Sequence, residues 1–264
     1  LQKMAKPNRS QVFMSVVDDL GFQVASRKGV QIKQAEGVNQ LEEVLQAFVE
    51  SADAGSELMS SQAAVLRDAP SCVLVNETDV VRGSWTPSHY SARRFRAIRG
   101  AASDGEFDLV PLSQLVEFCA DARRSAKWRP GMAYVSVLHV LGEGVVDLAG
   151  ATSYAPKTPG VPIKPGELLL SRINPRIPRV CIVPDLGRET LCSSEFEVMR
   201  PRGQLGAHLL AYLLLSEGVQ AQVRSLTSGT SASHNRIRTS ELSAVLIPVP
   251  KSGTLRAKQL EALA

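Results

Sequence analysis

Apolar residues between positions 39 and 57 follow the spacing of an amphipathic helix. They recur there every three or four residues, Asn39 stands where a helix N-cap would, and Glu42 follows three positions later. Residues 205–216 carry a denser leucine pattern, which predicts a helix with a wide apolar face. Further helices are predicted at residues 113–126 and 239–244, and a helix is predicted to begin within residues 251–264.

Short apolar runs that alternate or are β-branched, bounded by glycine or proline, predict strands along the rest of the chain. Residues 10–17 form the first run, and the turn signal at residues 18–21 predicts a hairpin into residues 22–24. The other predicted strands are residues 133–140, 145–148, 167–173, 180–184, 195–200 and 245–250.

This order of elements predicts an α+β fold in which helices pack on a mixed or antiparallel sheet, preceded by a small strand–helix segment. Residues 51–63 are small and polar and predict a linker, and the irregular stretch at residues 85–90 predicts a hinge. We therefore divide the chain into a hairpin-plus-helix segment at 1–60, a connector at 61–108, a main domain at 109–250 and the start of a C-terminal helix at 251–264.

Composition is that of an ordinary folded protein, with 44% hydrophobic and 21% charged residues among 264. No window approaches the 18 apolar residues of a membrane span, and the four cysteines are too widely spaced for a disulfide framework. We therefore expect a cytoplasmic protein with no membrane partner. The chain begins at Leu1 with no leader pattern, which suggests an internal fragment.

Charge is unevenly distributed along the chain. The net charge is +4, and the basic excess lies in residues 157–202 and 220–264, whereas residues 1–60 are acidic on balance. Such a balance favours a polyanionic partner only weakly, because a general preference for arginine explains it equally well.

Signatures of catalysis are absent from the sequence. It holds no Gly-x-Gly-x-x-Gly motif, no P-loop and no Gly-x-Ser-x-Gly elbow, and its four histidines stand apart from carboxylates at metal-ligand spacing. We therefore assign no catalytic residue and no metal ligand.

Arginines cluster in a proline-punctuated loop after the predicted strand 167–173. Guanidinium groups contact phosphates and guanine, and an asparagine amide suits adenine. A solvated loop with ion pairs to Glu167 or Glu189 is an equally good interpretation, and both stay open. The candidate DNA-binding residues of this loop are Arg172, Asn174, Arg176 and Arg179.

A second polar loop precedes the predicted helix 239–244. Small hydroxyl residues around a glycine allow the backbone to approach a polyanion closely, and two arginines supply charge. A flexible surface linker is the alternative interpretation. The candidate DNA-binding residues here are Ser228, Thr230, Ser231, Ser233, Asn235, Arg236 and Arg238.

The order of these segments resembles the target recognition domain of type I restriction-modification specificity subunits, which also occurs at the C-terminus of many adenine-N6 DNA methyltransferases. The similar stretches are PGELLLSRINPRIPRVCIV, SSEFEVMRP, LLAYLLLS and LTSGTSASHNRIRTSELSAVLIPVP, all within residues 109–250. Upstream, VFMSVVDDLGFQVASRKG and VNQLEEVLQAF resemble the tail of the methyltransferase catalytic domain, and WTPSHYS is similar to the connector that follows it.

The resemblance implies sequence-specific recognition of double-stranded DNA in a bacterial defence system. The family's Phe-x-Gly-x-Gly and Asn-Pro-Pro-Tyr/Phe motifs do not occur, since Asn174 and Pro175 are followed by Arg176 and Ile177. We therefore expect no cofactor in this chain. S-adenosylmethionine, and the pocket for a flipped adenine, would belong to a methyltransferase domain or subunit. The expected partners are duplex DNA, that methyltransferase and a restriction subunit.

Two other functions stay open at this point. The chain could be a catalytic fragment of a DNA methyltransferase or nuclease, which binding of S-adenosylmethionine or metal-dependent cleavage would reveal. It could also be a scaffold for subunit assembly, in which the helix at residues 205–215 and the segment 255–263 pack on partners.

Overall fold

A computed structural model describes most of the chain, which forms two compact units, Leu1–Arg96 and Ala97–Ala264. The boundary falls inside helix α3 (Ala92–Ala102). The described residues are 11–21, 23–24, 31–32, 37–53, 63–82, 85–102, 105–119, 124–175, 177–203, 205–227, 235–254 and 257–259.

The first unit is built on a three-stranded antiparallel sheet. Strand β5 lies in its centre, and its residues Ser71 to Val75 are all buried. The strands, in sheet order, are β1 (Gln11–Val16), β5 (Ser71–Asn76) and β4 (Ala63–Arg67), and β2 (Gln23–Val24) pairs separately with β3 (Gln31–Ile32). The helices are α1 (Leu41–Asp53), α2 (Glu77–Arg82) and the 3-10 turn η1 (Pro87–Tyr90).

The predicted hairpin between residues 10–17 and 22–24 is wrong. The turn itself forms, because the side chain of Asp19 accepts the N–H of Gly21 at 2.7 Å and Gly21 has a φ of 77°. Strand β1, however, pairs with β5 over six residues, from Gln11 opposite Asn76 to Val16 opposite Ser71. The apolar strand β5 gives β1 a largely buried partner over six residues, whereas β2 has only two residues.

Helix α1 confirms the predicted helix but not the packing that an amphipathic pattern implies. The side chain of Asn39 accepts the N–H of Leu41 at 3.2 Å, as expected near a helix start. Ala47 is fully buried, and Arg67 of β4 lies within ion-pair distance of Glu43 and Glu50. Four apolar side chains of α1 are nevertheless more than half exposed, namely Leu41, Leu45, Phe48 and Val49.

The second unit contains most of the strands and confirms the predicted α+β class with mixed and antiparallel pairing. Its largest sheet has the order β11 (Val180–Ile182), β10 (Leu168–Ser171), β13 (Phe196–Pro201), β7 (Val116–Phe118). A three-stranded sheet has the order β8 (Ala133–Val135), β12 (Thr190–Cys192), β9 (Val161–Ile163), in which β8 and β12 are parallel. Strands β6 (Phe107–Pro111) and β14 (Leu246–Pro250) form an antiparallel pair.

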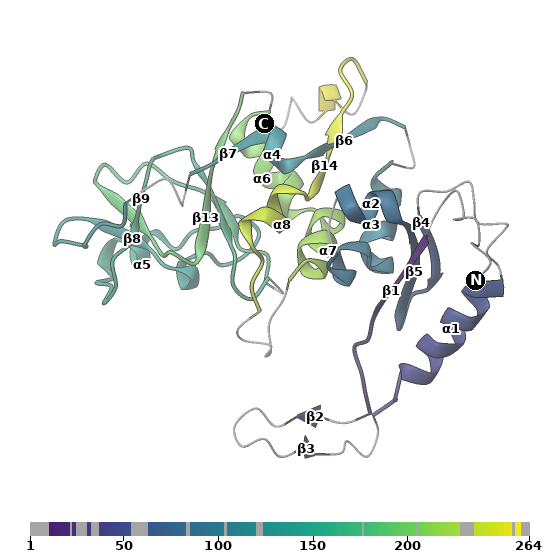
Figure 1. Ribbon diagram of the computed structural model, residues 1–264. Helices are drawn as coiled ribbons and strands as arrows, with labels where there is room; N and C mark the ends of the chain where they lie inside the picture. The colour runs from purple at the N-terminus through teal and green to yellow at the C-terminus, as the bar shows by residue number, and fades with distance from the viewer. Residues whose placement is uncertain are drawn as a thin grey trace. The chain divides into compact units, whose positions relative to one another are not determined.

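Helices lie at both ends of this unit (Figure 1). The helix α5 (Leu148–Ser153) lies beside β8, with the 3-10 turn η2 (Val137–His139) before it. At the other end, near β6 and β14, lie α4 (Leu112–Leu115), α6 (Ala207–Leu215), α7 (Glu217–Ser225) and α8 (Thr239–Ser243).

Several predicted elements of this unit need correction. The strand predicted at 133–140 ends at Val135, and residues 137–139 form the 3-10 turn η2. The helix predicted at 113–126 ends at Leu115, because residues 116–118 alternate and pair with β13 as strand β7. The strand predicted at 145–148 is only a single bridge at Val146, after which Asp147 caps α5. Helix α7 was not predicted, although it follows α6 directly.

Helix α6 fixes the position of the main sheet. Leu210 and Leu214 are fully buried, and they share one core with Leu168 and Leu170 of β10. Because this apolar face is buried inside the unit, it is not available to a partner. This burial contradicts the alternative scaffold function, in which residues 205–215 pack on a partner. Of segment 255–263, only residues 257–259 are described, and Ala257 is buried.

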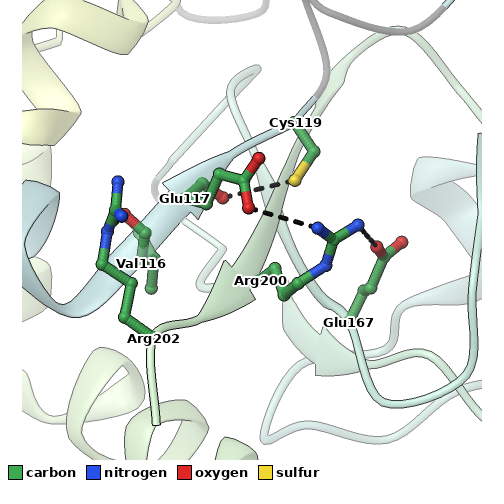
Figure 2. Close-up of polar contacts among 6 residues, drawn as sticks. All are labelled: Val116, Glu117, Cys119, Glu167, Arg200 and Arg202. Atoms are coloured by element: carbon green, nitrogen blue, oxygen red, sulfur yellow. Dashed lines mark hydrogen bonds and ion pairs between the residues drawn. The ribbon is translucent and has the colours of Figure 1, made fainter. Parts of the chain in front are cut away.

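Strand β7 is held at the sheet edge by charged side chains of β13 (Figure 2). Arg200 lies 3.2 Å from Glu117 and 3.3 Å from the buried carboxylate of Glu167, and Arg202 donates to the carbonyl of Val116 at 3.0 Å. Glu167 also accepts the N–H of Lys164 at 2.9 Å. These contacts tie β7 and the turn before β10 to β13.

Gly160 allows an extended segment to lie against the three-stranded sheet. Its N–H and C=O pair with those of Ala126 at 2.9 and 2.8 Å. A Cβ at this position would lie 2.7 Å from the ring of Tyr134 and 2.8 Å from the carbonyl oxygen of Cys192. Only glycine fits there without moving neighbouring atoms.

We expect Gly160→Ala to destabilise the protein by roughly 1–3 kcal/mol through overpacking. The matched control is Gly100→Ala in the exposed part of α3, where a Cβ meets nothing within 4 Å. That change should be neutral or stabilising by up to about 1 kcal/mol. Chemical unfolding of both variants measures the difference, and equal stability of the two would contradict the close packing at Gly160.

Candidate nucleic-acid interface

The two polar loops singled out in the sequence lie side by side at the end of β10. The N–H of Asn174 donates to the carbonyl of Asn235 at 2.9 Å, and the N–H of Ile237 donates to the carbonyl of Arg172 at 3.0 Å. These bonds continue the sheet pattern beyond Ser171 for a few residues. Segments more than sixty residues apart in the sequence therefore form one surface, as a shared DNA interface requires.

Arg172 is fixed in place by its neighbours on the turn before β13. Its guanidinium donates to the carbonyl of Ser194 at 2.7 Å and lies 3.7 Å from the carboxylate of Glu197. Glu197 is completely buried, and the same carboxylate oxygen accepts the hydroxyl of Thr239 at 2.7 Å. Arg172 is thus a positioning residue that links the loop after β10 to the start of α8.

Arg236 is held less tightly than Arg172. Its guanidinium lies 2.6 Å from the carboxylate of Glu195, and its side chain is 56% exposed. The backbone carbonyl of Glu195 also accepts the N–H of Arg172 at 2.8 Å. The ion pair expected as an alternative for the first loop therefore exists at Arg172, but its acid is Glu197 rather than Glu167 or Glu189. Arg236 of the second loop pairs with Glu195.

Arg179 and Arg238 have no ion-pair partner within the part of the chain that the structure describes. Arg238 precedes α8 with an exposed side chain, and its backbone N–H donates to Glu241 at 3.1 Å. Arg179 is half-buried at the far end of the loop, where its carbonyl accepts the N–H of Ser171 at 2.9 Å. Among the described residues, neither guanidinium group would have to give up a carboxylate in order to bind an external anion.

Asn174 lies at the tightest point of the first loop. It has a φ of 48°, a conformation that asparagine tolerates better than most residues, and its carbonyl accepts the N–H of Ile177 at 3.3 Å. Its side-chain oxygen is buried and has no hydrogen-bond partner among the described residues.

The remaining candidates, Arg176, Ser228, Thr230, Ser231 and Ser233, lie outside the described residues. Their contribution to DNA binding stays a prediction. The two acids that organise the surface, Glu195 and Glu197, were missed because they stand in a segment that the sequence marks only as a strand. A buried charge in the run Glu195-Phe196-Glu197-Val198 was the available signal, because such a charge needs a partner.

No protein-family model matches this chain, and no curated protein matches it. Among solved structures it is similar to one described for the complex assembly and conformational transition of the type I R-M system, at 18% identity, and to the HsdS subunit from Thermoanaerobacter tengcongensis, at 20%. Both TM-scores are 0.42, and each match covers 60% of this chain.

The first of these structures is described as part of a type I R-M system and the second as an HsdS subunit. This chain spans about two fifths of their length, with 40% and 42% covered. At this identity no residue's role passes from them to this chain.

Within the described ranges, no helix is long and apolar enough to cross a membrane, and no three His, Cys, Asp or Glu side chains lie close enough together to hold a metal ion.

We expect the two neighbouring arginines to differ in their effect on stability. Arg172→Met removes the ion-pair partner of a buried carboxylate and should cost roughly 3 kcal/mol, the low end for a broken buried pair, because Arg172 is itself partly exposed. Arg236→Met removes a surface pair and should cost less than about 1 kcal/mol. Urea unfolding of both variants tests this, and the reverse order would contradict the assigned roles.

Proposed function

We propose that this chain is a DNA-recognition module of a restriction-modification system, which binds double-stranded DNA at a specific sequence and presents a target adenine to a methyltransferase. The observation that carries the proposal is the backbone pairing of the two polar loops, between Asn174 and Asn235 and between Arg172 and Ile237. It is supported by the resemblance of residues 109–250 to type I target recognition domains.

The side chains on this surface fit the two tasks of a DNA-binding protein. Phosphate contacts position the protein and base contacts specify the sequence. Arg179 and Arg238, which have no acid partner among the described residues, suit phosphates. Asn235 carries an amide that can pair with adenine, and Arg236 suits guanine. The side chain of Asn174 would first have to turn its buried oxygen outward to do the same.

Rigid placement of these side chains is what makes base reading possible. Specific recognition costs less when the loop is ordered before binding, because less conformational entropy is lost on contact. The loop after β10 meets this requirement, since it is tied to Glu195, Ser194 and Asn235 by hydrogen bonds of 2.7–2.9 Å.

Methyl transfer belongs elsewhere in this proposal. A methyltransferase domain or subunit would hold S-adenosylmethionine and the pocket for the flipped adenine, and a restriction subunit would be a further partner in the cytoplasm. In this proposal, the chain recognises the target sequence on the DNA and carries out no chemical step.

The test is selection from a randomised duplex pool at about 50 and 200 mM salt, followed by sequencing of the retained DNA. We expect a short motif that contains adenine, with affinity that falls steeply as salt rises. The double variant Arg176→Ala/Arg236→Ala should lose the motif and flatten the salt dependence.

The matched control is Lys251→Ala/Lys258→Ala, which removes two exposed cations elsewhere in the same unit. It should retain the motif and the affinity. Retention of DNA without any motif by the unmodified chain, or unchanged selection by the arginine double variant, would count against the proposed interface.

A further inference from the structure

A second cationic surface lies along the extended segment 124–132, apart from the loops after β10 and before α8. The pairing of Ala126 with Gly160 seats this segment beside β9. Trp128 packs against the buried cluster of Met132, Tyr134 and Leu191, and its indole N–H donates to the carbonyl of Met132 at 3.0 Å. The segment is therefore held against the sheet, and it contributes lining residues to two cavities.

The smaller cavity, of about 210 Å³, has two lysines on its rim. Lys127 and Lys157 are both exposed, and within the described ranges neither forms an ion pair. Among the described residues, no acidic side chain lines this cavity. Its lining residues are Lys127, Trp128, Pro156, Lys157, Thr158 and Pro159.

The larger cavity, of about 320 Å³, is apolar at its base and charged at its rim. It is lined by Met132, Ile163 and Leu191, among others, and rimmed by Arg129, Lys164 and Glu189. Arg129 and Glu189 lie 3.4 Å apart, but both side chains are 72% exposed. Such a surface pair contributes little, so Arg129 can exchange Glu189 for another anion at small cost.

We call the segment 124–132 and the two cavities that it lines the groove. Hydrogen bonds connect this groove to the candidate interface. The hydroxyl of Tyr134 interacts with the side chains of Thr158, which lines the smaller cavity, and Ser193. Ser193 in turn accepts the N–H of Glu195 at 3.3 Å, and Glu195 pairs with Arg236. Burial raises the pKa of Tyr134, which keeps its hydroxyl protonated as a donor.

The distribution of charge indicates the kind of ligand. Among the described lining residues, four cationic groups stand against one carboxylate, and they are divided between two cavities that share no lining residue. A single small anion cannot reach both cavities, whereas a nucleic-acid backbone presents a row of phosphates. Lysine acts as a point charge and distinguishes no base, so contacts here would add affinity without sequence preference.

We propose that the groove around residues 124–132 binds the phosphate backbone of the duplex DNA whose bases the loops after β10 and before α8 read. This inference rests on the proposed DNA-recognition function. It assigns Lys127, Lys157, Lys164 and Arg129 to phosphate contacts and leaves base reading to the other surface.

The experiment compares binding of the full chain to two duplexes, one with the selected motif and one with the same bases scrambled, across a series of salt concentrations. Lys127→Ala/Lys157→Ala removes two phosphate contacts, so the slope of log affinity against log salt should flatten by about 1.8 on both duplexes. The preference for the motif should stay unchanged. Lys127→Gln/Lys157→Gln, which keeps more of each side chain, should behave in the same way.

The control Lys251→Ala/Lys258→Ala removes the same charge and should leave the slope unchanged. If the slope of both groove variants equals that of the control while the unmodified chain still selects its motif, the groove proposal is overturned and the recognition function stands. If the groove variants lose the preference for the motif itself, the groove reads bases and its assignment to backbone contacts is overturned. If the unmodified chain retains neither duplex at about 50 mM salt, both proposals fall.

Discussion

The buried carboxylate of Glu197 constrains the whole candidate interface. A buried carboxylate is costly unless it is paired with a cation and hydrogen-bonded. For Glu197, Arg172 supplies the cation and Thr239 supplies the hydrogen bond, and these two residues come from different segments. To reach Glu197, Arg172 must fold back over β13 and Thr239 must begin α8 beside it. The pairing of Asn174 with Asn235 then follows, because both segments are already held over the same strand.

This arrangement divides the arginines of the two loops by task. Arg172 is paired with Glu197, whose carboxylate is inaccessible to water, so Arg172 fixes the geometry of the loop after β10. Arg179 and Arg238 have no acid partner in the described ranges and retain their charge for an external anion. A loop with three arginines therefore offers fewer DNA contacts than its composition suggests, and the lysines around residues 124–132 supply charge that composition alone did not locate.

Local patterns predicted some elements and missed others, such as β4, β5, α2 and α3, which lie within the stretch 61–108 taken as a connector. Pairing between distant segments was a second source of error. The alternating run at 10–17 and the leucines at 205–216 gave β1 and α6 correctly. The partner of β1 was wrong, because the choice between β2 and β5 depends on burial that no local window contains. The same limit applies to the interface: arginine and asparagine marked both loops, but only the fold shows that Glu195 and Glu197 bind two of these arginines.

Exposure decides which of the two paired arginines can take part in reading DNA. To contact a guanine or a phosphate, each must leave its carboxylate. Arg236 and Glu195 are 56% and 29% exposed, so water and counterions can solvate Glu195 once the pair opens, and the exchange costs little. Arg172 would leave Glu197, which is 1% exposed, and no solvent could compensate that charge. In the proposed interface the two arginines therefore have opposite roles: Arg236 can exchange its carboxylate for DNA, and Arg172 stays paired and fixes the geometry of the surface.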